Sequence, residues 1–159
     1  MPLTLRPARL EDAPRILGFI TELATYERAA HEVVASVEDI HASLFAADAL
    51  CRALICERDG QPIGCAIYFY SYSTWLGRKG IYLEELYISP EHRGSGAGRL
   101  LLQHIAREAV EAGYGRVEWS VLDWNEPAIG FYRTLGAVAQ DEWVKYRLEG
   151  EALRAFARG

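Results

Sequence analysis

The stretch that most constrains this chain is a glycine-rich passage between a strand-like run and a helical run. It reads RGSGAGR over Arg93–Arg99, with three glycines at alternate positions. Gly80–Ile88 before it favours a strand, and Gly98–Ala112 carries apolar residues at helical spacing. Because glycine has no Cβ, the unpaired amides at the start of such a helix can approach an anion closely. The passage therefore predicts a strand–loop–helix unit with a phosphate site at its turn.

The remaining pattern predicts an α+β fold with a mixed central sheet flanked by helices. Asp59-Gly60 is a hairpin signal, so part of the sheet is antiparallel, and the helix over 98–112 predicts a parallel pair beside it. We expect strands over Leu3–Pro7, Cys51–Glu57, Ile63–Tyr72, Gly80–Ile88, Gly115–Leu122 and Val138–Leu148. We expect helices over Glu11–Tyr26, from the Ser36 cap to Phe45, and over Gly98–Ala112, Glu126–Leu135 and Glu151–Ala157. No linker or repeat divides the 159 residues, which predicts a single domain over 1–159.

Composition argues against several classes of partner. The formal net charge of −5 disfavours sequence-independent binding of nucleic acid, which needs clustered Lys and Arg. No apolar run is long enough to span a bilayer, and the N-terminus carries no signal-peptide pattern, so we expect a cytoplasmic protein. Cys51, Cys56 and Cys65 lack metal-ligand spacing and are interpreted as buried reduced thiols. We expect no metal.

The glycine passage also fits the pattern Arg/Gln-x-x-Gly-x-Gly/Ala, which binds the pyrophosphate of coenzyme A in the GNAT superfamily of N-acetyltransferases. Three blocks in order, TELATYER, YSTWLGRKGIYLEELYISPEHRGSGAG and VLDWNEPAIGFYRTLGA, resemble the diamine (spermidine/spermine) and thialysine N-acetyltransferase group of that superfamily. The resemblance covers nearly the whole chain. It implies the GNAT fold, acetyl-CoA as cosubstrate and direct acetyl transfer to a primary amine.

The resemblance also implies which residues hold acetyl-CoA. They are the end of the strand over 80–88, the glycine loop with the first helical turn, and the start of the helix over 126–135: Leu86, Tyr87, Ile88, Arg93, Gly94, Ser95, Gly96, Ala97, Gly98, Arg99, Asn125, Glu126, Pro127 and Ala128. The strand residues would use main-chain groups for the cofactor and side chains for the core. The Asn125 amide has two open uses, as a cap of the following helix or as a partner of a pantetheine amide.

Two residues receive catalytic roles from the resemblance. Glu84 would meet the substrate amine through water, and Tyr132 would act as general acid to the departing thiolate. An amine with a pKa of about 10 is mostly protonated at neutral pH, so transfer requires a base or desolvation. Strand alternation predicts that Glu84 and Glu85 face opposite ways, so that only one of them faces the cleft. A solvated strand face for Glu84 and a core position for Tyr132 are the structural alternatives.

The substrate site implied by the resemblance is acidic and aromatic. It comprises Tyr26, Glu27, Trp75, Glu84, Glu85, Glu118, Trp119 and Ser120. In the polyamine-acetylating branch an acid and then a proline precede the tryptophan, whereas here Ser73 and Thr74 precede Trp75. This departure favours the thialysine branch and a small primary amine. A polyamine acetyltransferase, a protein N-terminal acetyltransferase and a non-catalytic acyl-CoA-binding module remain as alternatives.

The segment Val138–Leu148 is rich in aromatic residues, including Trp143 and Tyr146. Relatives pair near this region, so we expect a homodimer. The alternative is that these side chains complete the core of one monomer.

Overall fold

The central sheet is built from strands that are mostly adjacent in sequence. A computed structural model describes residues 2–159. In it the sheet has the order β1-β2-β3-β4-β5, with antiparallel pairs from β1 to β4 and a parallel β4–β5 pair. The strands are β1 (Leu3–Pro7), β2 (Arg52–Arg58), β3 (Gln61–Ser73), β4 (Arg78–Ile88) and β5 (Val117–Trp119). This is the mixed α+β sheet that the sequence predicted.

The α-helices are α1 (Ala13–Tyr26), α2 (Val37–Phe45), α3 (Ala97–Glu111), α4 (Glu126–Thr134) and α5 (Gly150–Ala157). Short 3₁₀ turns precede α1, α2 and α3, at Leu10–Asp12, Ala30–Glu32 and Pro90–His92. The predicted Ser36 cap is confirmed, because its hydroxyl accepts from the Asp39 amide at 3.1 Å while the Asp39 carboxylate accepts from the Ser36 amide at 2.8 Å. The predicted hairpin is confirmed as well, since Asp59 and Gly60 have φ values of 53° and 75°.

The chain divides into two compact units. The first runs to Ser120 and contains the sheet with α1, α2 and α3; the second is Val121–Gly159 and contains α4 and α5. The single domain over 1–159 stays a prediction.

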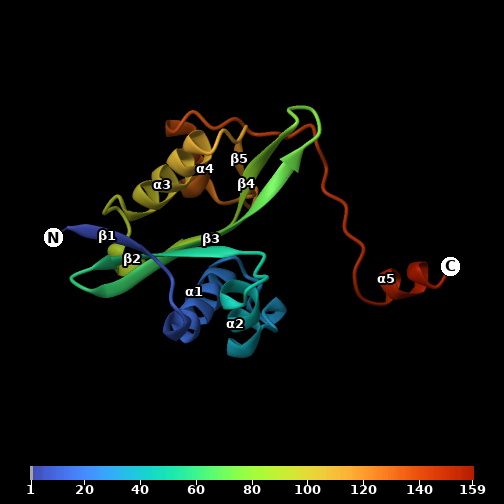
Figure 1. Cartoon of the computed structure of the whole chain (residues 1–159), viewed down its shortest axis with the longest axis horizontal. Coiled ribbons are helices and arrows are strands. Elements are labelled where there is room, and N and C mark those ends of the chain that lie inside the picture. Colours follow the sequence, from blue (N-terminus) through green and yellow to red (C-terminus); the bar gives the residue numbers. More distant parts are fainter. Residues whose placement is uncertain (1) are drawn as a thin grey trace. The chain divides into compact units, whose positions relative to one another are not determined.

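Helices cover both faces of the sheet in the first unit (Figure 1). Side chains of β3 alternate between these faces: Cys65 and Ile67 belong to the core beneath α1 and α2, while Tyr68 and Tyr70 reach α3. We call these two faces the α1 side and the α3 side.

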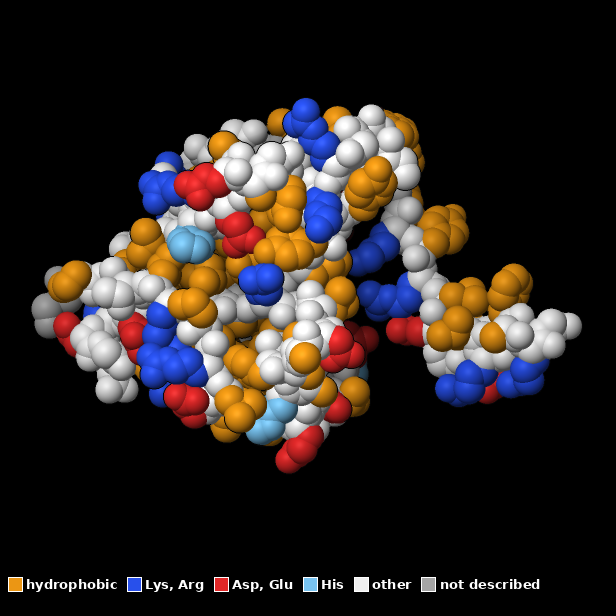
Figure 2. All heavy atoms as spheres, in the orientation of Figure 1, with side chains coloured by type: hydrophobic (Ala, Val, Ile, Leu, Met, Phe, Trp, Pro, Cys, Tyr) orange, Lys and Arg blue, Asp and Glu red, His pale blue; other side chains and the backbone are white. Residues whose placement is uncertain are grey.

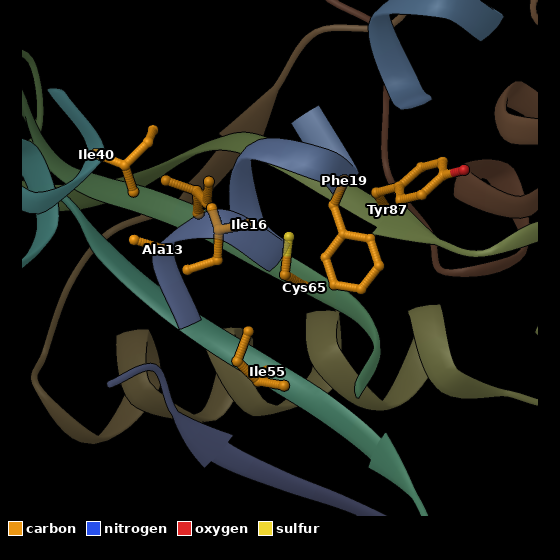
Figure 3. Close-up of a cluster of buried hydrophobic side chains, with 8 residues drawn as sticks. Ala13, Ile16, Phe19, Ile40, Ile55, Cys65 and Tyr87 are labelled. Atoms are coloured by element: carbon orange, nitrogen blue, oxygen red, sulfur yellow. The ribbon is translucent and has the colours of Figure 1, made fainter. Parts of the chain in front are cut away.

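The α1 side holds a core of buried apolar side chains (Figure 3). Its members come from α1, α2, β2, β3 and β4: Ala13, Ile16, Phe19, Ile40, Ile55, Cys65, Ile67 and Tyr87. The Phe19 and Tyr87 rings pack with centroids 5.9 Å apart. Burying one side chain of the size of Phe19 contributes about 1.5–3 kcal/mol, so this contact holds α1 firmly against β4.

On the α3 side, one carboxylate joins the helix to the sheet. The hydroxyls of Tyr68 and Tyr70 donate to the two oxygens of Glu108 at 2.7 and 2.6 Å. Burial raises the pKa of Tyr70 to about 12, and the bond to Glu108 adds to the shift. Both tyrosines therefore stay protonated donors, and α3 is fixed on the sheet next to the end of β4.

Two predicted strands differ from the structure. The strand over Gly115–Leu122 is shorter, because β5 pairs with β4 only over Val117–Trp119. The strand over Val138–Leu148 is wrong, since no strand forms there in the described chain. A strand needs a hydrogen-bonding neighbour, and apolar residues alone do not supply one.

The segment Val138–Leu148 instead leaves its large apolar side chains exposed. Trp143 is 65% and Tyr146 92% exposed, and Phe156 of α5 is 78% exposed. Figure 2 shows hydrophobic side chains on the surface of this C-terminal part of the chain. The second unit has no buried residue of its own.

Candidate active site

A bulge in β4 sets the direction of its acidic residues. Ile67 of β3 lies opposite Glu85. The next β3 residue, Tyr68, lies opposite Leu83, which leaves Glu84 as an extra residue in β4. Neighbouring residues of β3 point to opposite faces, so their partners Leu83 and Glu85 do so too, although they are two apart in sequence. The bulge thus turns Glu85 to the α1 side.

Glu84 is exposed, and its charge acts on a thiol of the α1 side. Burial raises the pKa of the Cys51 thiol, and the charge of Glu84 raises it further. Cys51 packs against the α1-side core, so the Glu84 carboxylate lies near that face. The expectation that only one of Glu84 and Glu85 faces the cleft stays a prediction, although the bulge interrupts the strand alternation on which it was based.

Three carboxylates form what we call the acidic cluster: Glu27, Glu84 and Glu85. Glu27 directly follows α1 and ends that helix. Burial raises the pKa of Glu85 to about 7, and the charges of Glu27 and Glu84 add to the shift. Burial also raises the pKa of Glu27. Neighbouring like charges, two of them partly buried, favour a bound cation, so this cluster is suited to an ammonium group.

The edge of β4 beside the acidic cluster is open within the sheet. β4 pairs with β5 only over Ile81–Leu83, so no strand of the described residues pairs with this edge over Glu84–Ile88. Every second residue there directs its N–H and C=O outward. An extended ligand with its own amides can bind such an edge in the manner of an added strand. This fits the main-chain role predicted for Leu86, Tyr87 and Ile88.

The glycine loop beyond β4 adopts a conformation that only glycine accepts readily. Gly94 and Gly96 have φ values of 78° and 87°. A Cβ on either would meet no other atom within 4 Å, so the space in front of both is open. The Ser95 hydroxyl donates to the His92 carbonyl at 2.6 Å and holds the loop, and Arg99 is exposed in the first turn of α3. The open amides of this turn fit the pyrophosphate of coenzyme A.

The Arg93 side chain takes a different direction from the rest of the loop. Its guanidinium carbon lies 5.4 Å from the centroid of the Tyr26 ring and 5.5 Å from that of the Tyr87 ring. Its Nε donates to the Ile88 carbonyl at 3.1 Å. Tyr87 belongs to the α1-side core. The side chain of Arg93, which was predicted to bind the cofactor, therefore lies on the α1 side, the same side as Glu85.

Three substrate residues were predicted at β5 and its end, and two of them, Glu118 and Ser120, lie on the same face of the sheet as Glu85. Tyr82 lies opposite Glu118, and its hydroxyl shares a 2.7 Å hydrogen bond with Ser120 Oγ. Trp119 lies opposite Leu83 and faces the α3 side. Sequence reasoning missed Tyr82, although its place two residues before Glu84 is the signal that would have found it.

The structure does not bring Trp75 to the acidic cluster of its own chain. Trp75 is 82% exposed in the turn after Ser73, which pairs with Arg78 at the end of the β3–β4 hairpin. Glu84 lies six positions after Arg78 along β4, which is roughly 20 Å at about 3.3 Å per residue. Its predicted substrate role stays a prediction.

The second unit carries the remaining predicted residues on α4. Asn125 Oδ1 accepts from the Ala128 amide at 3.4 Å, and Pro127 lies in the first turn. This is the capping use of Asn125; its bond to pantetheine stays a prediction, as do the cofactor roles of Glu126, Pro127 and Ala128. The Tyr132 ring packs on Phe131, with centroids 5.6 Å apart.

Residues 2–159 show no sign of a metal site or a membrane span. No three His, Cys, Asp or Glu side chains there gather as metal ligands would. None of the helices in that range combines the length and the apolar character of a membrane span. Cys56 and Cys65 are buried free thiols as predicted, whereas Cys51 is only half-buried.

The sequence profile of the Acetyltransferase (GNAT) family matches residues 15–137. The chain belongs to this family. It is a GNAT N-acetyltransferase of the acyltransferase class, and the family implies acetyl-CoA as cosubstrate. The matched range extends across both compact units.

Relatives of this GNAT acetyltransferase include enzymes for small amino acids. It is 37% identical to the thialysine N-epsilon-acetyltransferase of Sus scrofa over 164 residues, which cover 96% of each chain. It is 38% identical over 126 residues to an L-ornithine N5-acetyltransferase of Arabidopsis thaliana, with 79% of this chain and 52% of the other covered. The predicted resemblance to the thialysine branch is thereby confirmed.

A solved structure supports the fold of this acetyltransferase. An integron cassette protein from the mobile metagenome of V. cholerae superposes with a TM-score of 0.82 at 24% identity, covering 100% of this chain and 99% of the other. The predicted α+β GNAT fold is confirmed.

Proposed function

We propose that this acetyltransferase moves an acetyl group from acetyl-CoA to the terminal primary amine of a small aminoalkyl substrate. The substrate class is a lysine or thialysine-like amino acid or a short diamine. The observation that carries the proposal is the acidic cluster at the point where β4 and β5 stop pairing. An amine bound there would lie beside the strand edge that suits the pantetheine arm.

The acidic cluster would bind the ammonium form of the substrate and then take its proton. A carboxylate of ordinary pKa is about six units below an amine of pKa about 10, whereas Glu85, with a pKa of about 7, is about three units below it. The smaller difference in pKa favours Glu85 as the final acceptor of the amine proton, either directly or through water. Glu84, which by the resemblance meets the substrate amine through water, would then hold the amine electrostatically.

When bound, acetyl-CoA would supply the thioester carbonyl that the freed amine attacks. The open edge of β4 and the amides of the glycine loop would orient it, with Arg99 beside the pyrophosphate. Tyr132 would donate to the departing sulfur as the carbon–sulfur bond breaks. Asn125 and the first turn of α4 would contact the pantetheine arm. These roles follow the family resemblance.

The surroundings of Ser73 favour a small amine over a polyamine. Ser73 Oγ accepts from the Arg116 guanidinium at 2.9 Å, so a cation lies where the polyamine branch carries an acid. The acid that would attract a second ammonium of spermidine or spermine is therefore absent from this position. We therefore expect weak polyamine turnover.

Steady-state kinetics across thialysine, lysine, ornithine, putrescine, spermidine and spermine test the proposal. We expect the highest kcat/KM with an amino-acid or short diamine substrate. A strong spermine preference would instead support the polyamine alternative. Turnover confined to peptides would support a protein N-terminal acetyltransferase, and coenzyme A binding without any turnover would support a non-catalytic module.

The cytoplasmic location and the homodimer stay predictions. Neither enters the chemistry proposed for the acidic cluster.

A further inference from the structure

Arg93 stands at the boundary between two halves of the site. It begins the glycine loop, which leads from β4 to α3. The helix α3 packs on the α3 side through Glu108, whereas the Arg93 guanidinium lies over Tyr87 on the α1 side. The side chain therefore points away from the face on which the phosphate-binding helix lies.

Three contacts hold the guanidinium in this place. The Tyr26 ring comes from the last residue of α1, and the Tyr87 ring comes from β4. The hydrogen bond from Nε to Ile88 fixes the plane of the group. A planar guanidinium can stack on aromatic rings and donate at its edge at the same time, which a lysine ammonium cannot do.

Tyr87 is itself held from the side of α1. Its hydroxyl donates to Glu22 at 3.2 Å, and its ring packs on Phe19. Arg93, Tyr87 and Tyr26 thus connect β4 to the last turn of α1. The residue after that turn is Glu27, a member of the acidic cluster.

We propose that Arg93 is a positioning residue for the amine, holding Tyr26 and Glu27 against β4, and not a pyrophosphate ligand. This inference rests on the proposed function, since it assigns the end of α1 to the amine. The pyrophosphate is left to the main chain of the glycine loop and to Arg99. Arg93 thereby joins the cofactor loop mechanically to the substrate site.

The test compares Arg93→Met with Arg99→Met. Calorimetry with coenzyme A gives the Kd, and kinetics with thialysine and acetyl-CoA give both KM values and kcat. For Arg93→Met we expect a rise of about tenfold in the thialysine KM and a coenzyme A Kd within twofold of wild type. For Arg99→Met we expect the reverse, with the coenzyme A Kd about fivefold weaker. Equal loss of coenzyme A affinity in both variants would overturn the proposal.

A double-mutant cycle with Tyr26→Leu separates positioning from general damage. Once one ring is gone, Arg93→Met should raise the thialysine KM by only about twofold, because the contact it removes is already broken. Full additivity of the two changes would overturn the proposal. Arg93→Lys, which keeps the charge over the rings, should lie between Met and wild type and provides the readout if Arg93→Met does not fold.

The two proposals fail in different ways. If wild-type protein acetylates none of the amines, the proposed function is wrong. The coenzyme A Kd values still decide whether the Arg93 side chain binds pyrophosphate, since they need no amine.

Discussion

At the scale of single residues, Glu85 is a largely buried carboxyl whose pKa lies well above its ordinary value. Burial and two neighbouring carboxylates raise its pKa to about 7. A carboxyl with a raised pKa binds its proton more tightly in the folded chain than in the unfolded chain. Stability should therefore fall as the pH rises from about 4.5 to about 7.

Glu85→Gln removes this pH dependence. We expect the variant to be about 1–3 kcal/mol more stable than wild type at pH 8 and nearly equal to it at pH 4.5. Urea unfolding of the ligand-free protein at both pH values measures the difference. Glu84→Gln, at an exposed position, is the matched control and should change stability little. A gain of the same size at both pH values for Glu85→Gln would contradict the assignment.

Tyr132 is the residue on which the acid step depends. Replacing it by Phe keeps the ring that packs on Phe131 and removes only the hydroxyl. We expect kcat to fall about tenfold to a hundredfold, because a positioned proton donor contributes about that much or more. The coenzyme A Kd, measured by calorimetry, should stay within twofold. Unchanged turnover would assign the thiolate proton to another donor.

At the scale of elements, the backbone conformation of the glycine loop is expected to affect both stability and coenzyme A binding. Gly96→Ala places a Cβ on a residue with a φ of 87° and should cost about 1–2 kcal/mol in the free energy of unfolding. Coenzyme A binding should weaken too, because the new Cβ projects into the open space in front of the loop. Thermal unfolding and calorimetry measure the two effects.

Gly98→Ala provides the matched control for Gly96. Gly98 is helical, and a Cβ there would meet Ile88 Cγ1 at 3.9 Å, an ordinary contact. Its stability should stay equal or rise by up to about 1 kcal/mol. Equal destabilisation by both substitutions would mean that the left-handed conformation of Gly96 does not matter.

At the scale of the whole molecule, the exposed C-terminal segment bears on assembly. Val138–Leu148 keeps large apolar side chains in water, at a cost of about 25 cal/mol per Å² left unburied. A second copy of the chain is the partner that the sequence predicted. We expect light scattering to give twice the monomer mass at micromolar concentration.

Trp143→Ser combined with Tyr146→Ser should convert that dimer to a monomer. Val34→Ser, at a position 90% exposed, is the control and should leave the mass unchanged. If the wild-type chain is already a monomer at every concentration, the segment has another role.

Sequence reasoning succeeded for features that depend on neighbouring residues and failed for a feature that needs a partner distant along the chain. The helix cap at Ser36, the hairpin at Asp59-Gly60 and the glycine loop depend on residues a few places apart, and all three formed as predicted. The strand over Val138–Leu148 failed because a strand also needs a partner from elsewhere. Family membership was predictable for a different reason, because three blocks of the sequence match the family pattern in the right order.

The amino-acid sequence alone determined the family, the order of most elements and the chemical character of the loop, because these depend on composition and short spacings. Only the tertiary structure decided that Glu85 faces the α1 side, since the bulge at Glu84 arises from the register with β3. It also decided where Arg93 points and how far burial shifts the pKa of Glu85. Register and burial come from residues distant along the chain, and no local pattern encodes them.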